Sequence, residues 1–190
     1  MMELFGREQL FLLLRKWRKM NMVRDRNTKK ELVYAIREMK ISEYPLLKDF
    51  CYESIFTPEG YPPPDRSAVD HPLLKVYYVG FGSEIHDRAL VAEVDGKIVG
   101  AVWTRIMDDF GHVDDDTPSF AISLYSEYRG YGIGTKMMQK MLDWLRISGY
   151  EKASLSCQKE NYAVRMYRNL GFEIIDENDE EYIMIYKLQK

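Results

Sequence analysis

The chain has 190 residues, of which 46% are hydrophobic and 30% charged, a size that suits one compact domain of roughly 100–200 residues. This composition supports a buried core and excludes a disordered chain. No stretch reaches the roughly 20 apolar residues of a membrane span. We also expect no signal peptide, because the apolar run at 10–14 is short and its basic residues follow it.

The charge divides the chain into two parts. Residues 1–30 hold nine Lys and Arg against three Asp and Glu, whereas the whole chain has a net charge of −3, so residues 31–190 are acidic. An acidic domain disfavours nucleic acid as a partner and favours a cationic ligand. The two cysteines, Cys51 and Cys157, lie in no paired motif. They predict reduced thiols in a cytoplasmic protein rather than a disulfide or a metal site.

The basic N-terminal segment is predicted to form an amphipathic helix, with its apolar residues at helical spacing. These residues are Leu10, Leu13, Leu14, Trp17 and Met20. Three roles stay open for this helix: an arm docked on the acidic domain or on a second copy in a homodimer, a membrane-surface helix, or a poorly ordered extension. We rank the docked arm first.

The domain over 31–190 then begins with a predicted strand at 32–37 and a helix from Ser42 to about Ile55. The segment 57–64 must be a loop, because it contains three consecutive prolines. A further helix is predicted over 67–78. Two strands, 89–94 and 97–106, flank Asp95-Gly96, a strong hairpin signal.

An aspartate-rich loop, 108–117, leads to a strand over 119–125, in which apolar residues alternate with small ones. After a glycine loop, an amphipathic helix runs to Gly149. The remaining elements are a strand at 152–157, a helix at 161–170, and strands at 172–175 and 182–188 around an acidic turn. The order predicts an α/β (α+β) fold, with a mixed, mostly antiparallel twisted sheet of six to seven strands flanked by helices.

The glycine loop carries the clearest chemistry. It consists of Arg129, Gly130, Tyr131, Gly132, Ile133, Gly134 and Thr135 and joins a strand to a helix. Its glycines let the backbone approach a ligand closely. Their N–H groups, with the free donors at the helix start, form an anion site, to which the Arg129 guanidinium adds a charged donor.

Two common phosphate motifs fit this loop poorly. The dinucleotide fingerprint requires glycine where Thr135 stands, and the Gly-Lys-Ser/Thr of a P-loop is absent from the sequence. From the loop alone, a bound phosphate group and a strand-to-helix turn that merely uses glycine both remain open.

Together with a second motif further along the chain, the glycine loop resembles a known family. Arg129-x-x-Gly132-x-Gly134 resembles the pyrophosphate motif of the GNAT superfamily of acetyl-CoA-dependent N-acetyltransferases. The segment 161–172 is similar to that family's Asn-x-x-Ala-x-x-x-Tyr-x-x-x-Gly-Phe, with Asn161 and Tyr167 at the matching positions. The resemblance covers about residues 34–188. It implies the acyl-CoA N-acyltransferase fold and acetyl-CoA as co-substrate, with no metal.

The resemblance also implies roles for particular residues. The strand before the loop would carry a bulge and separate from the next strand, so that Leu124, Tyr125 and Ser126 contact the pantetheine arm and the acetyl carbonyl. The N–H groups from Arg129 to Thr135 would bind the pyrophosphate. Asn161 would bind the cofactor arm, or cap its helix instead.

By the same resemblance, Tyr167 would protonate the leaving thiolate, although a buried core aromatic is the alternative. We expect acetyl to pass directly to a primary amine in a ternary complex, because no nucleophile and base stand together near the two motifs. Cys157 is the one conceivable nucleophile, and it has no neighbouring histidine. The competing functions are a non-catalytic acyl-CoA sensor and a dinucleotide enzyme.

The acceptor side is less defined. Glu93, His112 and the run Asp114 to Asp116 are candidates for the general base, with a solvated loop as the alternative for the aspartates. A set of aromatic residues beside the triple proline could hold a cationic amine or simply pack the loop. These residues are Tyr52, Phe56, Tyr61, Tyr77 and Tyr78.

Overall fold

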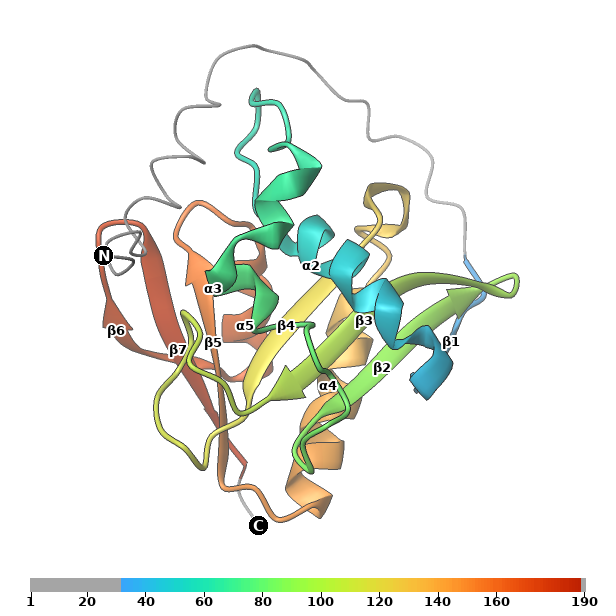
Figure 1. The fold of residues 1–190 in the computed structure, drawn as a ribbon. Helices are drawn as coiled ribbons and strands as arrows, with labels where there is room; N and C mark the ends of the chain where they lie inside the picture. Colours follow the sequence, from blue (N-terminus) through green and yellow to red (C-terminus); the bar gives the residue numbers. More distant parts are fainter. Residues whose placement is uncertain (1–31, 189–190) are drawn as a thin grey trace.

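The computed structural model describes residues 32–188, in which seven strands form one sheet with helices on both faces (Figure 1). The predicted N-terminal helix lies outside the described residues. The strands are β1 (Ala35–Glu38), β2 (Arg88–Val94), β3 (Lys97–Arg105), β4 (Ser119–Leu124), β5 (Lys152–Gln158), β6 (Glu173–Glu177) and β7 (Glu181–Lys187).

The sheet order is β1-β2-β3-β4-β5-β7-β6, and all neighbours are antiparallel except β4 and β5. This arrangement confirms the predicted mixed sheet. β4 and β5 are joined in register at only one pair, Ser119 with Ser154. The centre of the sheet is therefore weakly joined, because the strands share no further registered pair among the described residues toward Leu124.

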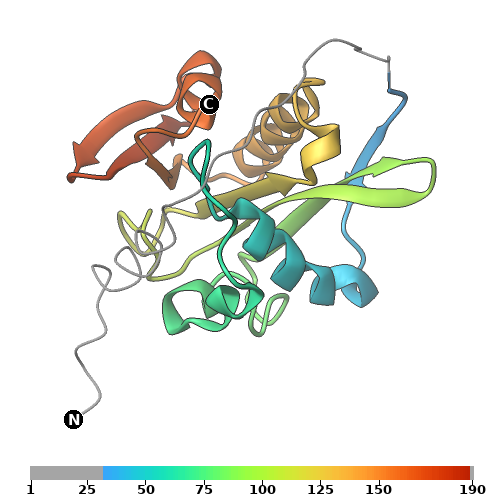
Figure 2. The same ribbon diagram turned by 90° about the horizontal axis from the view of Figure 1, so that it is seen from above.

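The helical elements cover the two faces separately. They are η1 (Ile41–Leu46), α2 (Leu47–Ser54), η2 (Arg66–Asp70), α3 (Pro72–Lys75), η3 (Ser126–Tyr128), α4 (Ile133–Ile147) and α5 (Ala163–Leu170). Figure 2 shows α4 on one face of the sheet and α2 and α3 on the other. Each face has its own core: Met137, Met141 and Leu145 of α4 are fully buried on one side, and Leu47 and Phe50 of α2 are buried on the other.

The hairpin prediction is confirmed. Asp95 and Gly96 both have positive φ, 50° and 78°, as a two-residue type I′ turn between twisted strands requires. The turn sets the β2–β3 register, which the antiparallel sheet then extends to β4.

The predicted helix over 67–78 is wrong. The segment instead forms two short helical pieces, η2 and α3, which are divided at His71-Pro72. His71 has an extended backbone (φ −63°, ψ 138°) and its ring accepts a hydrogen bond from the Leu73 N–H. The cause is proline, which disfavours helical geometry in the residue before it.

Smaller corrections concern the strands. β1 begins at Ala35 rather than at residue 32, and the turn between β6 and β7 is shorter than the predicted acidic turn. The bulge that the family resemblance implied is not in β4, whose register with β3 is continuous from Ser119 to Leu124. Register shifts lie instead in β2 and β6.

Candidate functional site

The glycine loop forms a tight turn at the end of β4. Gly130 and Gly132 have φ of 84° and 81°, the left-handed region that side chains with a Cβ rarely adopt. Gly132 is the N-cap of α4. A Cβ built on Gly130 or on Gly132 would meet no atom within 4 Å, so the space beside the loop is open.

Among residues 32–188, the first N–H groups of α4 have no backbone partner. The first intrahelical bond runs from the Lys136 N–H to the Gly132 carbonyl at 3.1 Å. The N–H groups of Ile133, Gly134 and Thr135 therefore precede the helical ladder, at the positive end of the helix dipole. This geometry suits an anionic group such as a phosphate.

Glycine at position 134 is needed for close packing rather than for a positive φ. A Cβ at this position would lie 3.3 Å from Leu124 Cδ1 and 3.8 Å from Met166 Sδ. The first turn of α4 therefore approaches both β4 and α5 closely, so that the three elements meet around one point.

The Arg129 side chain does not extend freely toward the anion site. Its Nε–H donates to the Leu124 carbonyl at 2.8 Å, and its terminal nitrogen lies 3.5 Å from a Glu53 carboxylate oxygen. The Arg129 N–H itself donates to the Ser126 carbonyl. In this structure Arg129 therefore fixes the loop to β4 and α2, a role that the sequence motif did not indicate.

The end of β4 offers fewer backbone donors than the sequence analysis assumed. The Tyr125 N–H donates to the Val99 carbonyl at 3.0 Å, which continues the β3–β4 ladder. The Tyr125 ring packs on Phe50 of α2, with 5.3 Å between the ring centroids. Of the three residues predicted to contact the thioester, Tyr125 thus already uses its N–H in a hydrogen bond to Val99.

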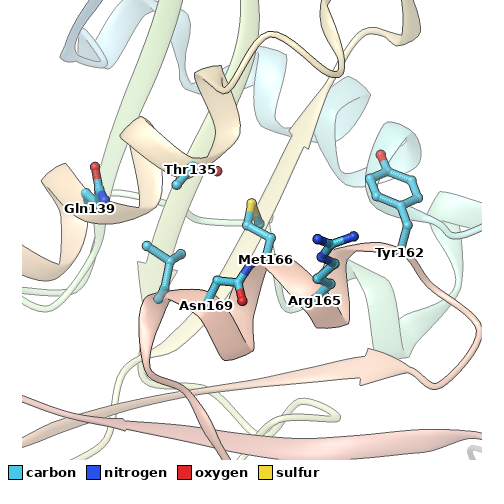
Figure 3. A pocket seen from close by; sticks show the side chains of 7 residues that line it. Thr135, Gln139, Tyr162, Arg165, Met166 and Asn169 are labelled. Atoms are coloured by element: carbon cyan, nitrogen blue, oxygen red, sulfur yellow. The ribbon is translucent and has the colours of Figure 1, made fainter. Parts of the chain in front are cut away.

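A groove of about 320 Å³ lies between α4 and α5. Figure 3 shows Thr135 and Gln139 of α4 on one side and Met166 and Asn169 of α5 on the other. Arg165 and the exposed Tyr162 complete it at the N-terminal end of α5. Because Thr135 belongs to both the groove and the anion site, the two form one continuous region.

Tyr167 is buried on α5, with an edge-to-face contact to Phe172. Burial raises the pKa of its phenol, and the neighbouring Cys157 and Tyr162 add to the rise. The phenol is therefore a neutral donor across the ordinary pH range. Within residues 32–188, its hydroxyl makes no hydrogen bond, so its donor remains available.

Asn161 lies directly before Tyr162, the N-cap residue of α5. Its side-chain oxygen accepts from the Ala163 N–H at 2.9 Å and its carbonyl accepts from the Val164 N–H. These two bonds form a turn that leads into α5, so the cofactor contact of Asn161 stays a prediction.

Cys157 and Cys51 are buried free thiols. Burial raises the pKa of the Cys157 thiol to about 12. A neutral, buried thiol is a poor nucleophile, which agrees with the predicted inert role for Cys157.

The predicted general bases are held by other partners or exposed. Glu93 forms a 2.8 Å ion pair with Arg37. Asp114 accepts hydrogen bonds from Lys152 and Thr117, which lower its pKa to about 2. His112 bonds to the Met107 carbonyl at 3.0 Å, and the Asp115 side chain is fully exposed.

The structure singles out a different aspartate of the same loop. Asp109 is only 3% exposed and accepts hydrogen bonds from Ser119 Oγ (2.7 Å), from the Gly111 N–H and from the Tyr77 phenol. Sequence reasoning missed Asp109 because this segment contains five aspartates. The following Phe110-Gly111 was the only local sign of a buried position.

The aromatic residues of the proline loop have packing contacts. The Tyr52 hydroxyl donates to the Pro64 carbonyl at 2.7 Å, and Arg66 lies over its ring at 4.6 Å. These contacts fix the loop against α2. They support ordinary packing for Tyr52 rather than binding of a cation.

Two features are absent from the described residues. Residues 32–188 contain no cluster of three or more His, Cys, Asp or Glu side chains arranged to hold a metal ion. In the same part of the chain, no helix is both long and apolar enough to cross a membrane.

Comparison with known sequences points to one family. The model of the acetyltransferase (GNAT) family matches residues 50–172. The chain is 34% identical over 84 residues to the probable N-acetyltransferase camello of Xenopus tropicalis, which covers 44% of this chain and 37% of that one. It is 28% identical over 154 residues to the N-alpha-acetyltransferase of Sulfurisphaera tokodaii, with 76% and 83% covered. The first of these matches therefore spans little more than a third of the relative.

Solved structures share the fold at low sequence identity. The PaiA N-acetyltransferase of Thermoplasma acidophilum, in complex with coenzyme A, has a TM-score of 0.60 at 18% identity, covering 82% of this chain and 99% of that one. The ribosomal-protein-S18-alanine N-acetyltransferase of Escherichia coli has a TM-score of 0.58 at 16% identity, covering 83% and 96%. With the family match over the glycine loop and α5, these findings establish that the chain belongs to the acetyltransferase (GNAT) family.

Proposed function

We propose that this protein is an N-acetyltransferase that moves the acetyl group of acetyl-CoA directly to a primary amine. The observation that carries the proposal is the continuous region formed by the end of β4, the turn at Gly130 and Gly132, and the groove between α4 and α5. An anion site joined to a groove of about 320 Å³ fits a pyrophosphate that carries further substituents.

Several residues would hold acetyl-CoA. The N–H groups of Gly130 to Thr135 would bind the pyrophosphate, with Arg129 fixing the loop from behind through Leu124. The pantetheine arm would lie beside Leu124 and Ser126, where β4 shares no register with β5. Its amides would then pair with strand edges, as an added strand does. Asn161 would contact the arm from the start of α5.

Tyr167 would supply the proton for the leaving sulfur. As the amine nitrogen bonds to the carbonyl carbon, the carbon–sulfur bond breaks and the sulfur leaves as a thiolate. A buried neutral phenol with an available O–H can protonate it. The buried, neutral Cys157 supports direct transfer rather than an acetyl-cysteine intermediate.

We propose a cationic acceptor, because the domain after residue 30 is acidic. Two relatives carry names that specify an N-alpha-acetyltransferase and an alanine N-acetyltransferase. A peptide with a free α-amine therefore belongs beside small amines among the acceptors to test. Two buried free thiols favour a reducing compartment, and we propose the cytoplasm.

Thermal shift tests cofactor binding. Acetyl-CoA at about 100 times its Kd should stabilise the folded chain by about 2.7 kcal/mol, which raises Tm by roughly 5–10 °C, whereas NAD should leave it unchanged. Thiol release over a panel of small amines and peptides then tests catalysis. Binding without thiol release on any amine would support the acyl-CoA sensor instead.

A further inference from the structure

The segment 76–79, after α3, is fixed tightly to β3. The indole N–H of Trp103 donates to the Tyr77 carbonyl at 2.9 Å. The Arg105 guanidinium donates to the carbonyls of Val76 (2.8 Å) and Val79 (3.0 Å). Two buried β3 side chains thus hold three carbonyl groups of this four-residue segment, and so fix the backbone that carries the Tyr77 phenol.

The phenol of Tyr77 donates to Asp109, on the loop between β3 and β4. Asp109 also accepts from Ser119 Oγ at 2.7 Å. Ser119 is the residue that pairs with Ser154, the one registered contact of β4 with β5. The Tyr77–Asp109 pair therefore lies at the point from which these two strands separate.

Ser154 adds an independent sign of a polar ligand at this point. Its side chain is fully buried, and its hydroxyl has no hydrogen-bond partner within the described residues. Ala153 and Leu155 belong to the core beneath α4, so strand alternation places Ser154 on the other face, with Tyr77 and Asp109. A buried hydroxyl without a partner is costly unless a ligand or water satisfies it.

The charges around this pair keep the phenol protonated. Burial raises the pKa of Asp109, while the hydrogen bonds from Ser119, Tyr77 and Gly111 and the charge of His112 oppose the rise. Burial also raises the pKa of Tyr77 far above its usual value, together with the charges of Asp109, Cys51 and Glu181. Proton transfer along this pair therefore runs from Tyr77 toward Asp109.

We propose that Asp109, acting through the Tyr77 hydroxyl, accepts the proton that the acceptor ammonium must lose before it attacks. The inference rests on the proposed function and extends it to the opposite face of the sheet from Tyr167. Tyr77 contacts the amine and Asp109 is a positioning residue that receives the proton.

The ammonium gives one proton to the Tyr77 oxygen while the Tyr77 O–H proton passes to the Asp109 carboxylate, which leaves a neutral amine and a neutral carboxyl. The amine nitrogen then bonds to the thioester carbon and the carbon–sulfur bond breaks. The nitrogen loses its second proton as the thiolate gains one, and Asp109 returns its proton to water.

The test compares Asp109→Asn and Tyr77→Phe with Asp108→Asn, a matched control at the exposed neighbouring aspartate. Each variant is assayed with two acceptors of similar shape, one with an amine pKa near 10 and one already neutral at the assay pH. With the first, Asp109→Asn and Tyr77→Phe should lower kcat by roughly 100-fold. With the second, the loss should shrink to a few-fold, because no proton has to be removed.

A pH profile gives the second readout. With the acceptor whose amine pKa is near 10, the wild-type rate should rise with pH through a limb that Asp109→Asn loses and Asp108→Asn keeps. The acceptor that is already neutral should show no such limb, because no proton has to be removed from it. Equal losses with both amines would assign the pair a structural role and overturn the proposal. If the wild type turns over and Asp109→Asn has the same kinetics, the proposal is also overturned. If the wild type is inactive on every amine, the proposed function is overturned instead. Tyr77→Phe decides the question if Asp109→Asn does not fold.

Discussion

Arg129 Nε donates a hydrogen bond to the carbonyl oxygen of Leu124 at 2.8 Å, and so ties the first residue of the glycine loop to the last residue of β4. The same guanidinium reaches the Glu53 carboxylate and carbonyl on α2. A residue that the motif assigns to phosphate therefore connects three elements of the fold. Its effect on cofactor binding is expected to come from holding the loop in shape.

Arg129→Lys separates charge from geometry. Lysine keeps a cation that can reach a phosphate but cannot bond to Leu124 and Glu53 together. We expect acetyl-CoA affinity to fall about tenfold, or about 1.4 kcal/mol, in both Arg129→Lys and Arg129→Ala, measured by calorimetry. If Arg129→Lys binds as tightly as the wild type, the charge acts directly on the phosphate and the anchoring role is wrong.

Gly132→Ala tests the left-handed N-cap of α4. With φ at 81°, alanine costs about 1–2 kcal/mol and should lower Tm by roughly 2–8 °C. The control is Gly134→Ala, which has ordinary backbone geometry and a 3.3 Å contact with the flexible Leu124 side chain. A larger Tm loss in Gly134→Ala than in Gly132→Ala would contradict this assignment.

Tyr167→Phe removes only a hydroxyl that makes no hydrogen bond within residues 32–188. We therefore expect an unchanged Tm and an unchanged Kd for acetyl-CoA, with kcat lower by about 100-fold. Because burial raises the pKa of the phenol, deprotonation of Tyr167 should produce no decline in rate below pH 9. Full turnover in this variant would leave Tyr167 as a core aromatic.

Glu43 is expected to make stability dependent on pH. Its hydrogen bond with Arg37 lowers its pKa from 4.5 to about 2, against an opposing effect of desolvation. A pKa that is lower in the folded state contributes stability above about 4.5, and this contribution is lost as the pH falls toward 2. Glu43→Gln should thus have a lower Tm than the wild type at pH 6, and the difference should disappear near pH 2.

The exposed Glu38→Gln on β1 is the matched control for that measurement. Its Tm should follow the wild type across the whole range. If Glu43→Gln does the same, the Arg37–Glu43 pair contributes nothing measurable, as is common for partly exposed ion pairs.

The elements that depend on local backbone geometry or on residue spacing could be predicted from the sequence. Asp95-Gly96 specified its hairpin because few other pairs tolerate two positive φ values. The α4 face was visible because Met137, Met141 and Leu145 repeat at helical spacing, and all three are buried. The segment over 67–78 was predicted wrongly because Pro72 interrupts an otherwise helical pattern.

Only part of the candidate site could be predicted from the sequence. The glycine turn was predicted because it depends on local backbone, and its position before α4 is confirmed. The partners of the Arg129 side chain were not predicted, since Leu124 and Glu53 come from two other elements. Nor could the sequence distinguish Asp109 from its neighbours, because its burial depends on contacts with Tyr77 and Ser119.

The single pairing of Ser119 with Ser154 has a mechanical consequence. Toward Leu124 and Gln158 it leaves two half-sheets, β1–β4 and β5–β7, whose facing edges share no further registered pair within residues 32–188. A ligand lying along both edges would bond to β4 and to β5 and so hold the two half-sheets together. Amide hydrogen exchange in β4 and β5 should therefore slow on acetyl-CoA binding, while the β2–β3 hairpin stays unchanged.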